Sequence, residues 1–71
     1  MKIWKNKVDN KYDVFVDSDK PYHGFLIIKD GDKELFKEET HIAYDARFGP
    51  DLNDVYAWES KCIEIIDKIR I

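Results

Sequence analysis

The sequence predicts an α+β domain with four antiparallel strands, arranged as two hairpins, followed by one C-terminal helix on one face of the sheet. Three observations lead to this prediction. Alternating apolar and polar residues flank the pair Asp9-Asn10, a similar pattern flanks residues 30–33, and a stretch with helical spacing follows Pro50. The 71 residues leave room for one domain over 1–71. The 44% of hydrophobic residues is typical of a globular chain rather than a disordered one.

The first hairpin is expected to consist of strands over residues 2–8 and 11–17. Aspartate and asparagine tolerate the left-handed backbone that a tight turn between strands requires. A turn centred on Asp9-Asn10 pairs residues of matching chemistry across the strands: Lys2 with Asp17, Ile3 with Val16, and Trp4 with Phe15. Alternation then places two sets of side chains on opposite faces: Ile3, Tyr12, Val14 and Val16 on one, Trp4 and Phe15 on the other.

The second hairpin is expected over residues 24–29 and 34–43, with residues 18–23 as a polar loop because Pro21 cannot donate to a strand ladder. Asp30-Gly31-Asp32-Lys33 is a strong turn signal. Closing the hairpin at Lys29 and Glu34 pairs opposite charges. This register continues with Ile28 opposite Leu35 and Ile27 opposite Phe36, so we expect Ile27 and Phe36 on the face under the helix.

The helix is predicted over residues 51–70. Asp51 can cap its start, and Asp54 lies in the first turn, where carboxylates meet the positive end of the helix. Apolar residues recur at spacings of three and four, which defines a stripe that faces the sheet. The stripe consists of Val55, Trp58, Cys62, Ile65 and Ile69, with Leu52 and Ile66 beside it.

The predicted strands carry more large apolar residues than one helix can cover. The face away from the helix is expected to hold Trp4, Phe15, Leu26, Ile28 and Leu35. We expect this face to bind a second copy of the chain or another protein, since exposed apolar patches of a few hundred Å² are often functional. The alternative is that the 18–24 loop, the 44–50 loop or the chain ends fold over it.

A second functional class is a single-stranded nucleic-acid-binding module. The first hairpin combines aromatic and basic side chains in the manner of a stacking platform: Trp4, Tyr12 and Phe15 with Lys2, Lys5, Lys7 and Lys11. The net charge of −3 argues against this class. A protein-binding or regulatory role is therefore the first expectation, and nucleic acid is the alternative.

The sequence shows none of the motifs that enzymes, metal sites or cofactor sites require. Ser18 and His23 share a loop without a surrounding motif, and Cys62 lies on the buried stripe, where a thiol is usually inert. We expect a non-enzymatic protein with no cofactor, no metal and no small-molecule ligand. With one cysteine and no long apolar run, a cytoplasmic protein without a membrane segment is expected.

One further segment is distinctive in composition, the loop that precedes the helix. Tyr44, Arg47 and Phe48 are its candidate functional residues. Arg47 could clamp a carboxylate or a phosphate, although a salt bridge to a neighbouring aspartate is the simpler interpretation.

Overall fold

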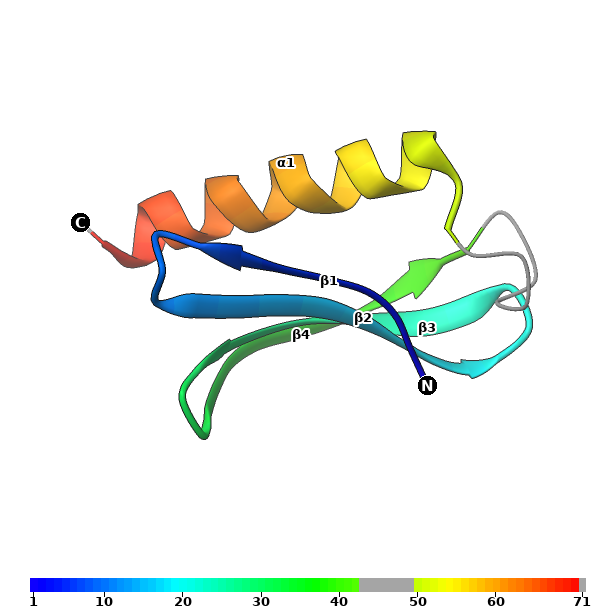
Figure 1. Ribbon diagram of the computed structural model, residues 1–71, viewed down its shortest axis with the longest axis horizontal. Coiled ribbons are helices and arrows are strands. Elements are labelled where there is room, and N and C mark those ends of the chain that lie inside the picture. Colours follow the sequence, from blue (N-terminus) through cyan, green and yellow to red (C-terminus); the bar gives the residue numbers. More distant parts are fainter. Residues whose placement is uncertain (43–49, 71) are drawn as a thin grey trace.

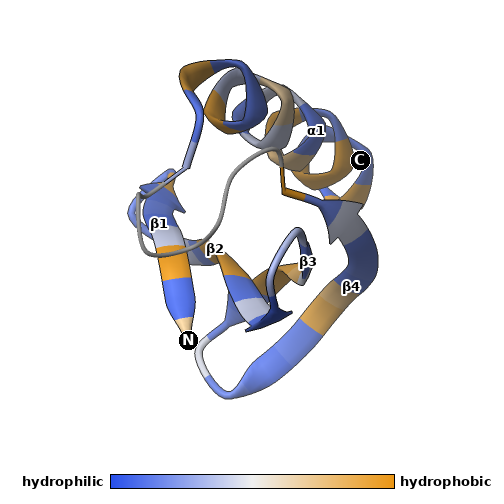
Figure 2. Cartoon of the chain, turned by 90° about the vertical axis from the view of Figure 1, so that its right-hand side faces the viewer, coloured by the Kyte–Doolittle hydropathy of each residue, from blue (hydrophilic) through white to orange (hydrophobic). Residues whose placement is uncertain are grey.

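The computed structural model describes residues 1–42 and 50–70 and confirms the predicted fold class. Strands β1 (Lys2–Val8), β2 (Tyr12–Lys20), β3 (His23–Asp30) and β4 (Lys33–His41) form one antiparallel sheet in the order β1-β2-β3-β4. The helix α1 (Leu52–Ile69) follows and lies along one face of that sheet (Figure 1). Seen end-on, α1 lies above the sheet, and β1 and β4 are the two edge strands of the sheet (Figure 2). The predicted end of the fourth strand at residue 43 lies outside the described residues.

The connection between β2 and β3 is shorter than expected, because Pro21 lies in a tight turn rather than in a longer loop. Lys20 pairs with His23, so only Pro21 and Tyr22 connect the strands. Tyr22 has a positive φ of 66°. Proline at the first turn position and a positive φ at the second are the marks of a type II turn. The prediction of a polar loop over 18–23 was therefore wrong, and both strands extend further than expected.

A β-bulge changes the register of the first hairpin. Lys2 pairs with Asp17 as predicted, but Trp4 pairs with Val16 instead of Phe15. Three residues separate the paired Val8 and Tyr12, and Asp9 and Asn10 have the predicted left-handed φ angles of 57° and 54°. Ile3 is the extra residue of the bulge, so Lys2 again lies opposite its predicted partner, Asp17. Both Ile3 and Trp4 pack against the core.

A second bulge changes the register of the β3–β4 hairpin by one residue. Lys29 pairs with Glu34 as predicted, and Ile28 then pairs with Phe36 rather than with Leu35. The extra residue is Leu35, and both Leu35 and Phe36 pack against the core. Ile27 consequently pairs with Lys37 and lies on the face opposite to the one predicted.

The core lies between the sheet and α1. Val14 pairs with Ile28 and Val16 with Leu26, so these four side chains share the face that the helix covers. The core cluster consists of Tyr12, Val14, Val16, Leu26, Ile28, Ile42, Trp58, Cys62 and Ile66. From the helix stripe, Trp58 and Cys62 are buried as expected. The third buried residue of the helix is Ile66, because it lies four residues after Cys62, as Cys62 does after Trp58. Ile69, which was predicted to be buried, is 43% exposed.

A backbone hydrogen bond defines the start of the helix, and an ion pair connects its end to the sheet. The Val55 amide donates to the Asp51 carbonyl at 3.0 Å, which places Asp51 at the N-cap as predicted, although its side chain makes no capping bond. At the other end, Arg70 forms ion pairs with Asp67 on the helix and with Asp9 in the β1–β2 turn. The C-terminal end of the helix is therefore held beside the β1–β2 turn.

Candidate interaction surface

The five side chains predicted to form an open apolar face do not share one face. Leu26 and Ile28 are 2% and 0% exposed beneath α1, and Trp4 pairs with Val16 on the same covered side. Leu35 also packs against the core. Only Phe15 keeps its predicted position away from the helix. The predicted placement was wrong because each of the two bulges moves the alternation in its strand by one residue, and because β3 pairs with β2 so that Leu26 and Ile28 lie on the helix side.

The open face of the sheet is covered largely by lysine side chains. Phe15 and its cross-strand neighbour Ile27 are each only 7% exposed. The Lys2 Nζ lies 4.4 Å from the centre of the Phe15 ring, and the Lys37 Nζ lies 4.8 Å from that of Phe25. Lysine stems shield apolar surface while their ammonium groups stay in water. This face is therefore an amphipathic surface of lysines and carboxylates rather than an exposed apolar patch.

The aromatic residues expected to form a stacking platform are also divided between the two faces. The Trp4 ring packs against Trp58 of the helix, with ring centroids 5.7 Å apart. Tyr12 is 5% exposed within the core, and the Lys2 ammonium covers Phe15 on the other side. These three rings cannot stack successive bases in this conformation.

A groove between β1 and α1 is a largely apolar concavity among the described residues. It has a volume of about 210 Å³ and is lined by Trp4, Asn6, Lys7, Val8 and Val14 from the sheet and by Glu59, Cys62 and Ile63 from the helix. Because β1 pairs only with β2 among the described strands, the groove lies beside an edge of the described sheet. Grooves of this kind, beside a strand edge, recur as sites for extended peptides.

Exposed apolar side chains extend this groove along the helix. Ile63 is 50% exposed, Tyr56 is 63% exposed and Leu52 is 69% exposed. Residues three, four or seven apart lie on one side of a helix, so these three side chains share one side of α1, on which Ile63 lines the groove with β1. The sequence contained a signal for this flank, since Tyr56 and Ile63 are seven residues apart and lie outside the main apolar stripe.

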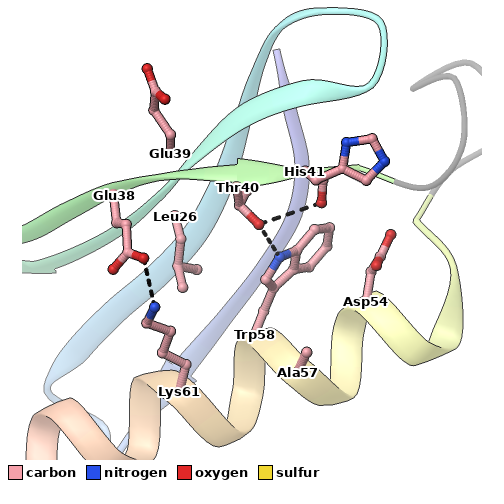
Figure 3. Close-up of a pocket in the computed structure, with 9 residues that line it drawn as sticks. All are labelled: Leu26, Glu38, Glu39, Thr40, His41, Asp54, Ala57, Trp58 and Lys61. Carbon is pink, nitrogen blue, oxygen red and sulfur yellow. Dashed lines mark hydrogen bonds and ion pairs between the residues drawn. The ribbon is translucent and has the colours of Figure 1, made fainter.

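The opposite flank of α1, toward β4, is polar. A pocket of about 270 Å³ is lined there by Leu26, Glu38, Glu39, Thr40, His41, Asp54, Ala57, Trp58 and Lys61 (Figure 3). The Trp58 Nε1 donates to the Thr40 Oγ1 at 2.9 Å, and Lys61 forms an ion pair with Glu38 at 2.7 Å. The two flanks of one helix thus differ in chemistry.

The residues considered as a catalytic pair have structural hydrogen-bond partners. The Ser18 Oγ lies 3.1 Å from the Lys20 carbonyl oxygen and 3.2 Å from that of His23. The His23 ring contacts Asp19 at 2.6 Å, and this hydrogen bond lowers the pKa of the Asp19 carboxyl. Both contacts brace the β2–β3 hairpin. Within residues 1–42 and 50–70, no three metal-ligating side chains come together.

The Cys62 thiol lies deep in the core, where it is 0% exposed. Burial raises its pKa to about 11, and the nearby Glu59 carboxylate adds to the shift. We expect Cys62 in the native protein to react with iodoacetamide at pH 8 at least about 100-fold more slowly than in urea, because the thiolate is the reactive form. Mass spectrometry of timed samples measures this ratio, and equal rates in both conditions would contradict the buried position.

Tyr44, Arg47 and Phe48, the candidate residues of the loop before the helix, lie outside the described residues. The part of the chain that the structure describes includes no helix of the length and apolar character that a membrane span requires. Comparison with known proteins gives no match to any family model, curated protein or solved structure.

Proposed function

We propose that this chain is a small non-catalytic protein-binding module whose binding surface is the flank where β1 and α1 meet. The apolar groove between Trp4, Val8 and Ile63 is the observation that carries the proposal. Tyr56 and Leu52 extend this surface along the helix. Aromatic and aliphatic side chains beside a pocket are the usual anchors of protein interfaces.

A binding role is also favoured over catalysis by the positions of the reactive side chains. Cys62 is buried with a raised pKa, which opposes formation of the nucleophilic thiolate. The Ser18 hydroxyl contacts two backbone carbonyls, and His23 pairs with Asp19. Each of these groups has a role in the packing or hydrogen bonding of the fold.

The proposal is tested by selecting ligands from a random peptide library displayed on phage, with the full chain immobilised. We expect the selected peptides to lose at least about tenfold in affinity for Ile63→Glu, because a carboxylate would then stand in the apolar groove. Ile63 is half exposed, so the variant should fold, and circular dichroism checks this.

The matched control is Ala57→Glu, which adds the same carboxylate to the polar flank of the same helix. Binding of the selected peptides should change less than about twofold, because the substitution lies outside the groove. Peptides that bind both variants equally well, or that shift the amide resonances of the polar flank instead, would overturn the proposal.

A further inference from the structure

We infer that the partner at this surface is an extended segment with alternating acidic and apolar residues, which adds to the sheet as a fifth strand beside β1. This inference rests on the proposed function and specifies its ligand. Strand addition of this kind takes its affinity from main-chain hydrogen bonds and its specificity from alternate side chains. The edge of β1 and the side chains on its two faces provide these two elements.

The edge of β1 has main-chain groups available for a neighbouring strand. It pairs with β2 on one side, and no described strand lies on the other. The Lys7 amide donates at 2.8 Å to the side chain of the adjacent Asn6 instead of to a strand. Asn6 is exposed, so its side chain can give up this bond to an incoming carbonyl.

The side chains of β1 set the chemistry of the added strand on both faces. Trp4 and Val8 line the groove under α1 on either side of Asn6, which favours apolar residues of the partner on that side. Lys5 and Lys7 point to the open face, where they pair across the sheet with Phe15 and Asp13. Residues of the partner on this side therefore lie beside ammonium groups, which favours carboxylates.

Lys5 is the lysine of β1 best placed to pair with carboxylates of the partner. Lys7 contributes weakly, because it already pairs with Asp13 at 3.7 Å. Lys5 makes no ion pair with any side chain of residues 1–42 and 50–70. It borders a depression of about 360 Å³ on the open face together with Lys2 and Lys29. Because Asp13 and Phe15 of β2 and Lys29 of β3 also line it, the depression extends inward from β1, and Lys2 and Lys5 are its lining charges on the edge strand.

The same charges disfavour a second copy of the chain at this edge. Antiparallel pairing of two β1 strands that keeps Trp4 and Val8 over the groove brings Lys5 of one copy beside Lys5 or Lys7 of the other. Like charges directly opposite one another destabilise a strand pair, and edge lysines commonly prevent such pairing. We therefore assign the site to a different chain.

The other edge of the sheet provides an internal contrast. β4 carries three glutamates and two lysines, whereas β1 carries three lysines and no acidic residue. An acidic strand is therefore attracted to β1 and repelled at β4. A basic strand would show the opposite preference, so the sign of the peptide charge identifies the edge.

The experiment uses three eight-residue peptides with the ¹⁵N-labelled full chain. One alternates valine and glutamate, one alternates valine and lysine, and one contains the valines and glutamates in a non-alternating order. We expect the first to shift the amide resonances of Lys5 and Lys7 most and to bind at least about tenfold more tightly than the others. The variant Lys5→Glu should reverse the preference between the two alternating peptides. Lys33→Glu, in the distant β3–β4 hairpin, should leave it unchanged.

Several outcomes would overturn the inference. These are equal binding of the alternating and non-alternating peptides, resonance shifts at β4, or concentration-dependent self-association through β1 in sedimentation. A twelve-residue oligothymidine that shifts Lys5 and Lys7 when the valine–glutamate peptide does not would assign the lysines to nucleic acid. If phage-selected peptides still depend on Ile63 but do not alternate, the proposed function stands and only the strand-addition model fails.

Discussion

Replacing Trp58 with alanine is expected to leave the protein only marginally stable at room temperature. Trp58 is 4% exposed, packs against Trp4 and donates a hydrogen bond to Thr40. Truncation of a buried aromatic residue costs about 3–5 kcal/mol. A small domain has a total stability of about 5 kcal/mol or little more, so this loss removes most of it. Urea denaturation followed by circular dichroism measures the change.

The variant Trp58→Phe separates packing from hydrogen bonding at the same site. It keeps an aromatic ring at this position and removes the indole N–H that binds the Thr40 hydroxyl, together with part of the ring volume. The expected loss is about 1–2 kcal/mol, because the half-buried hydroxyl retains some access to water. A Trp58→Ala protein with an unchanged urea midpoint would contradict the position of this ring between sheet and helix.

The second large effect is expected for Leu26→Asp, which should abolish folding. Leu26 is 2% exposed under α1, and burying a carboxylate there without a partner costs several kcal/mol in addition to the lost packing. Phe25→Asp is the matched control, because the preceding side chain points to the open face and is only partly buried. Its effect should be clearly smaller, as measured by the amide dispersion of each variant in NMR spectra.

This comparison also tests the register of the sheet. If Leu26 lay on the open face, as the sequence pattern indicates, then Leu26→Asp would fold and Phe25→Asp would not. The pairing of Leu26 with Val16 and Glu38 predicts the opposite order. The two variants therefore distinguish the two registers directly.

Local signals in the sequence were sufficient to predict the order of the elements. Asp9-Asn10 and the segment around Gly31 define two turns, and both are found where predicted. The spacing of Trp58 and Cys62 predicted the buried side of the helix. These signals depend on neighbours a few residues apart, so no tertiary contact is needed to interpret them.

The faces of the sheet could not be predicted in the same way, because a bulge changes the alternation without a strong local signature. At Ile3-Trp4 and again at Leu35-Phe36, two adjacent apolar side chains pack against the core where strict alternation would separate them. Each bulge is stabilised by burial beneath α1, which is distant in the sequence. The predicted surplus of apolar residues on the open face follows from this missed feature.

Only part of the candidate site could be predicted from the sequence. The seven-residue spacing of Tyr56 and Ile63 marked a second apolar flank on the helix, and Lys5 and Lys7 marked a basic strand. Their combination depends on how α1 lies on the sheet, which the Arg70–Asp9 ion pair and the Trp58–Thr40 hydrogen bond fix. The sequence by itself determined the elements and the charge of β1. Only the tertiary structure decided which apolar side chains remain exposed, because burial depends on contacts between segments far apart in the chain.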